Sequence, residues 1–351
     1  MTTFEYTDVV PQPRRPWDNS ASAIKRGVVL IVLSGVFGYV ATMFTGLSGF
    51  LGWYVGLVFA VPVIAFIGSA RHGWNISSDR IAASLVSVAF ATVAIPWVSI
   101  FWTVIANGSK AFHKSYFTTD MRVTAFSDDL NMGGLKHAII GTLVMVLLAS
   151  AIAVPLGILA AVYIVEIKGR FAKLVRFLTQ AMSGVPSIVA GLFIYSTVII
   201  FFGSFSAIAG ALSLVILMLP TVARTSEEVL KIVPDDLRSA SYALGASQAR
   251  TTVRVVLPTV ASGLVSATVL GIARVVGETA PLLLTASYFV GTSFKVTEPI
   301  ASLPVYVFTG LTLGDANATT RSWGGSLVLL LIVFVLFLFA RFVSTRLTRK
   351  H

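Results

Sequence analysis

The residues that this sequence lacks exclude several classes of protein. It contains no cysteine, which excludes a disulfide framework and thiolate chemistry. Charged residues make up 12% of the chain, against roughly 25% in soluble domains. This low value excludes a soluble globular enzyme and a disordered chain. No Gly-Lys dipeptide occurs, so we expect no Walker A loop and no ATP site. The four histidines lie far apart without metal-ligand spacing. We therefore expect no catalytic residue, metal or cofactor in this chain.

Apolar residues take the place of the missing charge. The chain of 351 residues is 56% hydrophobic, and its mean hydropathy is +0.87. It carries 26 Lys and Arg against 15 Asp and Glu. These basic residues are too sparse to favour a nucleic-acid partner, and we expect them to mark the cytoplasmic side of a membrane. The composition predicts an all-α polytopic protein in a lipid bilayer.

A membrane-spanning helix needs roughly 20 apolar residues. The first apolar run is soon followed by a second, which favours a retained span over a cleaved signal peptide. The sequence predicts eight spans, at about 27–45, 50–69, 80–106, 137–165, 174–202, 207–223, 259–284 and 325–343. With the N-terminus inside, 19 of the 26 basic residues fall in cytoplasmic segments, six fall outside, and Arg274 lies within a span. This bias predicts two cytoplasmic termini.

The connecting segments suggest an organisation into five parts. They are a cytoplasmic tail over 1–26, a transmembrane hairpin over 27–79, a span with an extracytoplasmic loop over 80–136, a main transmembrane domain over 137–343 and a basic cytoplasmic tail over 344–351. The largest cytoplasmic segment, about 224–258, lies between spans six and seven.

The cytoplasmic segment predicts a short amphipathic helix. Pro234 suits a first helical position, and Asp235 and Asp236 follow in the first turn, where the helix dipole favours acids. Gly245 either ends this helix or lets a partner approach closely, and Pro258 opens the next span. The apolar face is Leu237, Ala240, Ala243 and Leu244. An ordinary solvated loop helix is the alternative interpretation.

Span seven contains two charged residues. An arginine at the position of Arg274 costs roughly 2.5–3.5 kcal/mol on insertion scales. Glu278 stands four residues later and can pair with it on one helix face. Two interpretations stay open: the two residues form a structural pair, or Arg274 faces a translocation path and meets an anion while Glu278 orients it.

Small residues recur every four positions in the same span, at Gly263, Ala267 and Gly271. This spacing lets another helix approach closely. The stripe predicts a helix seam, either within the chain or against a second subunit.

Span five contains Pro186, which removes an intrahelical hydrogen bond. Ser183 and Ser187 lie beside it. Broken membrane helices tend to line cavities, so these serines are candidates for a substrate path. A simple kink satisfied by serine hydroxyls is the alternative.

Two stretches of sequence resemble a known family. Ser239-Ala240-Ser241, Gly245, Val255 and Leu257-Pro258 stand at the places of the ATPase-coupling loop of ABC-transporter permeases, which reads Glu-Ala-Ala, three residues, Gly, nine residues, an aliphatic, one residue and Leu-Pro. Ser239 departs from the family's Glu, whose contact is then missing or comes from Asp235 or Asp236. The string 277–286, Gly-Glu-Thr-Ala-Pro-Leu-Leu-Leu-Thr-Ala, resembles the PstA-type permease of the phosphate ABC importer.

The resemblance covers roughly 120–345 and implies a type I ABC permease core of six helices, here preceded by an extra hairpin. It implies a second homologous permease subunit, two copies of an ATPase that binds ATP and Mg²⁺, and an extracytoplasmic phosphate-binding protein. Phosphate is then the substrate, and residues 234–247 contact the ATPase. The alternatives are a permease for another oxyanion such as sulfate or molybdate, and an ion-coupled secondary transporter.

Overall fold

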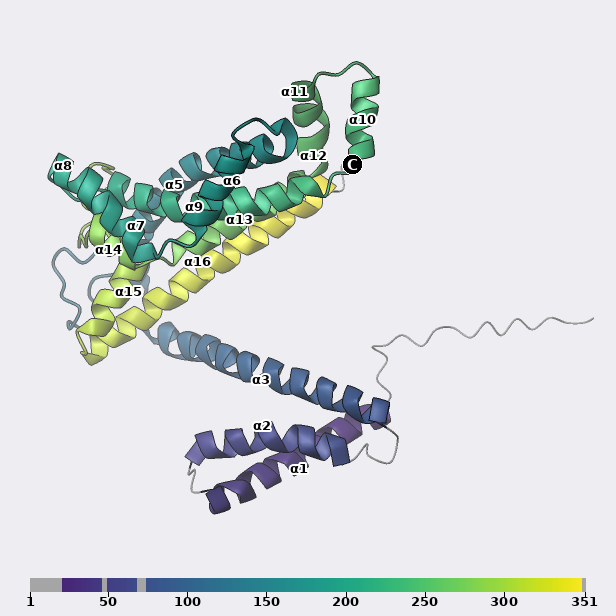
Figure 1. The fold of residues 1–351 in the computed structure, drawn as a ribbon. Coiled ribbons are helices and arrows are strands. Elements are labelled where there is room, and N and C mark those ends of the chain that lie inside the picture. The colour runs from purple at the N-terminus through teal and green to yellow at the C-terminus, as the bar shows by residue number, and fades with distance from the viewer. Residues whose placement is uncertain (1–20, 46–48, 68–73, 349–351) are drawn as a thin grey trace, which may run out of the picture. The chain divides into compact units, whose positions relative to one another are not determined.

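The computed structural model describes residues 21–45, 49–67 and 74–348. The chain divides into two compact units, residues 1–101 and 102–351 (Figure 1). All regular structure in the described ranges is helical, which confirms the predicted all-α class. Most of the predicted N-terminal tail and the last three residues lie outside the described residues, and so do the turn 46–48 and the segment 68–73.

The first unit contains the predicted hairpin. It consists of α1 (Ala21–Thr45), α2 (Gly49–Ile67) and the first part of α3 (Trp74–Gly108), which continues into the second unit. Helices α1 and α2 approach closely because glycine faces glycine: a Cβ on Gly56 would lie 2.8 Å from Gly38 Cα. The Trp53 indole N–H also donates to Gly35 O (3.1 Å). Glycine at these positions therefore lets the backbones of the two helices come into contact.

Four long helices form the second unit. They are α5 (Lys136–Val162), α9 (Ala207–Lys231), α13 (Ala261–Val276) and α16 (Ala316–Thr348). Helix α9 packs against both α5 and α13, with Val222 against Gly157 on one side and Gly271 on the other. Met145, Leu214 and Met218 are fully buried in this core. The wall of the site described below is therefore a helix that is fixed from both sides.

Two predicted spans are broken. Helix α6 (Ala172–Ser183) meets α7 (Ser187–Ile194) at an angle of 105°, which confirms the predicted break near Pro186. Helix α7 continues through a π-helical turn, Tyr195–Ile199, into α8 (Ile200–Phe202). Span seven was predicted as one helix over 259–284, and this is wrong. Helix α13 ends at Val276, and α14 (Ala280–Thr285) starts afresh after Gly277.

Two other helices are longer than the spans predicted for them. Span six was predicted to end at 223, but α9 continues to Lys231, because its charged residues find partners along the helix. Glu227 accepts ion pairs from Arg176 (2.9 Å) and Lys231 (2.9 Å). The last span was predicted from 325, but α16 already begins at Ala316.

One end of the second unit is held by a buried arginine. Arg321 of α16 is fully buried. Its Nη2 donates to the carbonyls of Asp128, Asp129 and Met132 at 3.2, 2.7 and 2.7 Å, and its own carbonyl accepts from the Tyr116 hydroxyl (2.8 Å). Three short elements complete this end: the 3-10 turn Ser109–Ala111, α4 (Lys114–Thr118) and α15 (Leu303–Thr312).

The opposite end carries the predicted amphipathic helix. It contains α10 (Asp235–Ala243), α11 (Gln248–Thr251), a π-helical turn Thr252–Val256 and α12 (Leu257–Thr259). Figure 1 shows α10 at the same end as the C-terminal part of α16, away from α15. Helix α10 and the C-terminal part of α16 therefore lie at one end of the second unit.

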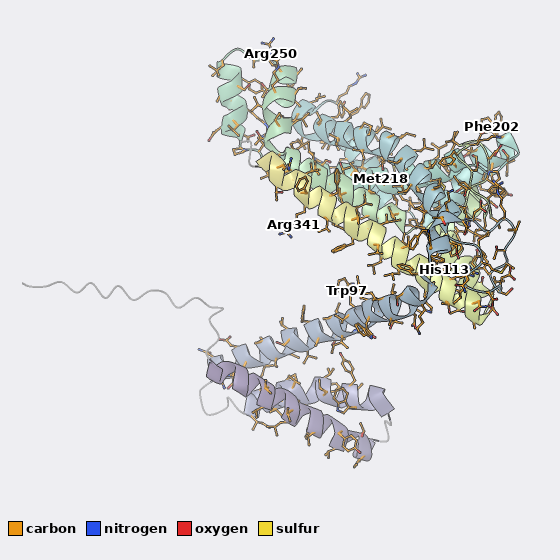
Figure 2. All side chains as sticks on the ribbon, turned by 180° about the vertical axis from the view of Figure 1, so that it is seen from behind. Trp97, His113, Phe202, Met218, Arg250 and Arg341 are labelled. Carbon is orange, nitrogen blue, oxygen red and sulfur yellow. The ribbon has the colours of Figure 1, made fainter. Side chains whose placement is uncertain are left out.

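By length and composition, four described helices can cross a membrane, or up to six if each bent pair counts as one span. Many large apolar side chains on them face outward, such as Trp97 and Phe202 (Figure 2), as expected of helices in lipid. The total of eight spans and the cytoplasmic placement of both termini stay predictions.

Candidate functional site

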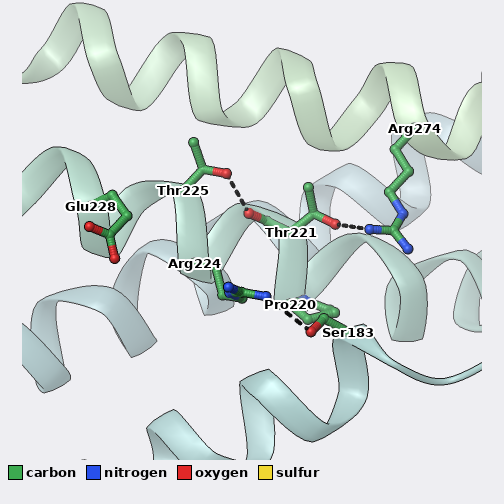
Figure 3. A pocket seen from close by; sticks show the side chains of 7 residues that line it. All are labelled: Ser183, Pro220, Thr221, Arg224, Thr225, Glu228 and Arg274. Atoms are coloured by element: carbon green, nitrogen blue, oxygen red, sulfur yellow. Dashed lines mark hydrogen bonds between the residues drawn. The ribbon is translucent and has the colours of Figure 1, made fainter.

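An open cavity of about 340 Å³ lies where α6, α9 and α13 meet. Ser183 closes α6 on one side, Arg274 comes from the last turn of α13, and α9 supplies the remaining wall (Figure 3). The lining residues are Ser183, Pro220, Thr221, Arg224, Thr225, Glu228 and Arg274. The cavity thus joins two residues predicted from sequence, Ser183 and Arg274, with five that were not predicted.

Arg274 reaches from α13 to α9. Its Nη1 donates to the Thr221 hydroxyl (3.0 Å), and the residue is exposed. The predicted pair with Glu278 is absent. Helix α13 ends at Val276, before Glu278, so the two residues do not share a helix face. The Glu278 backbone N–H instead donates to Val275 O (3.2 Å). The Arg274 guanidinium therefore stays available at the cavity.

Arg224 is a second cationic group on the same cavity. Its Nη1 donates to the Ser183 hydroxyl (3.4 Å), as Figure 3 shows. Within the described part of the chain, neither Arg224 nor Arg274 has a carboxylate within ion-pair distance. Glu228 also lines the cavity, but its carboxylate lies 2.8 Å from Lys231 Nζ. Two guanidinium groups and three hydroxyls thus face one open space.

Sequence reasoning missed Arg224 because span six was ended just before it. A signal was present in the helical spacing. Thr221, Thr225 and Glu228 recur at intervals of three and four, so they share one face of a helix that continues past Pro220. Arg224 lies on this same face, one turn after Thr221.

Ser187 and Glu278 do not line the cavity. Ser187 opens α7 beyond the break and is partly buried. Glu278 lies in the short connection between α13 and α14. Of the four predicted substrate-path residues, the structure therefore brings Ser183 and Arg274 together and leaves Ser187 and Glu278 outside.

The predicted seam residues lie against α9 of the same chain. A Cβ on Gly263 would be 2.6 Å from Val229 Cγ1, and a Cβ on Gly271 would be 2.6 Å from Val222 Cγ2. Ala267, between them, is fully buried. Of the two places considered for this seam, the structure places it within the chain.

The predicted coupling residues surround the exposed helix α10. Asp235 and Asp236 occupy its first turn, but Pro234 precedes the helix with extended backbone and is not its first residue. Gly245 follows with φ +79°, and nothing lies within 4 Å of the position of its Cβ. This left-handed conformation ends the helix and favours glycine. Ser239 and Ala240 are exposed.

The apolar face of α10 has no cover in the described structure. Leu237, Ala240, Ala243 and Leu244 are all exposed, and Leu244 is 90% exposed. Ser241 joins α10 to α11 through the Thr251 hydroxyl (2.8 Å).

The prediction that Pro258 opens span seven is wrong. Leu257 and Pro258 belong to α12, and the axis bends by 74° at Val260 before α13 begins.

Known proteins match most of this chain. Residues 153–349 match the family described as binding-protein-dependent transport system inner membrane component. The phosphate transport system permease protein PstA 1 of Mycobacterium tuberculosis (strain CDC 1551 / Oshkosh) is 43% identical over 274 residues, 76% of this chain and 90% of that protein. The phosphate transport system permease protein PstA of Yersinia pestis is 35% identical over 285 residues, 80% of this chain and 94% of that protein.

Among solved structures, a chain of the inward-facing methionine ABC transporter MetNI matches 60% of this chain and 93% of its own length, with a TM-score of 0.48 and 21% identity. The family match and the two sequence relatives decide the assignment. The chain belongs to the family of binding-protein-dependent transport system inner membrane components. Within that family it belongs to the PstA phosphate transport system permease proteins.

Proposed function

We propose that this chain is the transmembrane permease subunit of an ATP-driven importer that carries inorganic phosphate across the plasma membrane. The names of its relatives support the substrate, and the cavity supports the chemistry. The observation that carries the proposal is the pair Arg224 and Arg274, two guanidinium groups at one open cavity without a carboxylate partner among the described residues.

The cavity suits a tetrahedral oxyanion. Guanidinium groups present several N–H donors in a fixed fork and pair well with phosphate oxygens. The hydroxyls of Ser183 and Thr221 accept hydrogen bonds from Arg224 and Arg274 and so hold the two guanidinium groups at the cavity, while their own protons go to helix carbonyls. Glu228 adds negative charge at one edge, which weakens anion binding. A site that conducts must release its ligand as well as bind it, so a weak cavity fits a transport path better than a storage site.

The exposed face of α10 supports docking of an ATPase. The proposed assembly contains a second homologous permease subunit, two ATPase subunits that bind ATP and Mg²⁺, and an extracytoplasmic phosphate-binding protein. Leu237 and Leu244 offer apolar contacts, and Asp235 and Asp236 offer charge beside Ser239. Closure of the ATPase would then tilt the helices as rigid bodies.

Uptake into vesicles that carry the complete complex tests this function. We expect ATP-dependent uptake of phosphate and not of sulfate. Arg274→Gln should lower phosphate uptake by about tenfold or more, as loss of a charge-assisted hydrogen bond predicts, while assembly and ATP hydrolysis persist. Arg341→Gln is the matched control, because Arg341 is exposed near the end of α16 and away from the cavity.

Three outcomes would contradict parts of the proposal. Wild-type uptake by the Arg274→Gln complex would remove this residue from the path. Uptake of sulfate or molybdate in place of phosphate would keep the permease and overturn the substrate. Uptake driven by an ion gradient without ATP would overturn the energy source.

A further inference from the structure

We propose that the buried ion pair between Glu166 and Arg238 is a clasp that ties α10 to the ends of α5 and α9, so that displacement of α10 moves both helices. Glu166 and Arg238 are then positioning residues for coupling and do not contact the substrate. The inference rests on the proposed function, because it names the residues through which ATPase closure would reach the cavity.

Arg238 joins three elements with one side chain. Its Nη2 lies 2.7 Å from Glu166 Oε1, and its Nε lies 3.3 Å from both carboxylate oxygens. Its Nη1 donates to Val233 O (2.6 Å), and its Nη2 donates to Leu230 O (3.1 Å). These carbonyls belong to the C-terminal end of α9 and to the residues just after it. The same guanidinium of α10 therefore bonds to carbonyls at the C-terminal end of α9 and to Glu166 in the turn that extends α5.

Glu166 binds both segments that flank Gly245. It lies in the π-helical turn Tyr163–Ile167, which extends α5. Its carboxylate holds Arg238 of α10, and its backbone carbonyl accepts from Gln248 Nε2 of α11 (2.6 Å). π-Helical turns occur often at functional sites. Here the turn places one residue between the two short helices of the cytoplasmic segment.

This attachment is mostly polar. The apolar residues of α10 are exposed, whereas the side chain of its Arg238 is only 14% exposed and that of Glu166 only 2%. A buried ion pair adds little net stability compared with an apolar pair, because its charges must lose water. The geometry it imposes is specific, since the arginine fork fixes the direction of α10 relative to two helices.

The route from the clasp to the cavity follows one helix. Leu230, whose carbonyl binds Arg238, lies on α9, and so do Arg224 and Thr221 of the cavity. Helix α9 packs closely against α5 and α13, so a tilt applied at its end moves these helices together and shifts the cavity wall. Detaching α10 would leave the cavity intact and remove the link to it.

The test compares phosphate moved per ATP hydrolysed in the full complex. The variant is Glu166→Gln with Arg238→Gln, which leaves no unpaired buried charge and so favours folding. We expect the ratio to fall about tenfold, in the range known for residues that carry coupling, while ATP hydrolysis continues. Arg238→Lys keeps the charge but loses the fork, and it should give an intermediate ratio. It also serves as the test variant if the double variant fails to assemble.

Glu298→Gln is the matched control, because its carboxylate forms an exposed ion pair with Lys295 (2.8 Å) at a distance from α10 in sequence and fold. We expect a wild-type ratio from it. A wild-type ratio in the clasp variants would overturn the proposal.

A second measurement separates failure of the clasp from failure of the proposed function. Hydrogen–deuterium exchange of the α10 amides in the purified complex does not depend on the substrate. We expect faster exchange over 235–243 in the clasp variants and no change with Glu298→Gln. If the wild-type complex moves no phosphate, the substrate proposal fails and exchange alone decides about the clasp. Unchanged exchange in the clasp variants would overturn it even where the transport ratio falls.

Discussion

The arginines at the cavity and the arginine that attaches α10, Arg238, have opposite surroundings. At the cavity, Arg224 and Arg274 have hydroxyl partners and stay open to solvent. At the root of α10, Arg238 is largely buried and bonds to a carboxylate and two carbonyls besides Asp235. An arginine with every donor occupied can fix structure but has no donor left for a ligand. An arginine that faces an open cavity with donors to spare can bind an anion.

The physical reason for this difference is the cost of burying charge. A buried ion needs polar partners, either a counter-ion as at Arg238 or carbonyl oxygens as at Arg321, because removing it from water costs several kcal/mol. An exposed guanidinium carries no such requirement and can exchange water for phosphate. The comparison therefore predicts that substitutions at Arg238 change stability as well as coupling, whereas substitutions at Arg274 change transport and leave stability nearly unchanged.

The largest effect on stability is expected at the root of α10. Arg238→Met leaves Glu166 buried without its partner and should lower the free energy of unfolding by about 3–5 kcal/mol. Arg274→Met removes an exposed charge and should change it by less than about 0.5 kcal/mol. Thermal melting of the purified complex measures both. Equal losses from the two variants would break the comparison.

A smaller effect is expected at the seam that supports the cavity. Gly271→Leu should lower the free energy of unfolding by about 1–3 kcal/mol, as overpacking does in other cores, because its Cβ would meet Val222 Cγ2 at 2.6 Å. Gly277→Ala is the control, since nothing lies within 4 Å of its Cβ position. Thermal melting again gives the result, and a stable Gly271→Leu complex would contradict the tight contact with α9.

The smallest effect on stability is expected at Asp120, which lies neither at the cavity nor at the attachment of α10. Burial opposes ionisation of Asp120, but hydrogen bonds from the Thr292 and Arg122 amides and the Thr292 hydroxyl outweigh it and lower the Asp120 pKa. A lowered pKa in the folded state stabilises the protein above the ordinary value of 3.8, and this contribution is lost as the pH falls through the folded-state pKa.

We therefore expect the contact between Asp120 and Thr292 to loosen only in strong acid, with an effect below about 1 kcal/mol. Spin labels placed on the two loops report their separation as the pH is lowered. Asp120→Asn should already show the looser state at pH 7. Loosening near neutral pH would contradict the direction of the pKa shift.

Local sequence signals predicted much of the architecture. The apolar runs, Pro186 and the pattern 235–245 gave the helices, the broken span and the exposed helix α10. These features depend on residues that are close together in the sequence, so the sequence alone shows them. The cavity was predicted in part, because Arg274 is an evident charge within an apolar run.

The remainder depends on contacts between distant residues. Glu166 and Arg238 are 72 residues apart, and no local pattern joins them. Span six was predicted to end at 223, just before Arg224, whereas α9 continues to Lys231 with Glu227 paired to Arg176, a residue 51 positions earlier. Glu278 was assigned to the face of Arg274, and Gly277 ends the helix before it.

The most direct test of the account is uptake of radiolabelled phosphate by the complex with Arg224→Gln, with Arg274→Gln and with both. Each single loss should lower uptake by about tenfold or more, as for a charge-assisted hydrogen bond. The double variant should abolish uptake while thermal stability and ATP hydrolysis stay near the wild type. Wild-type uptake by the double variant would show that phosphate does not pass this cavity.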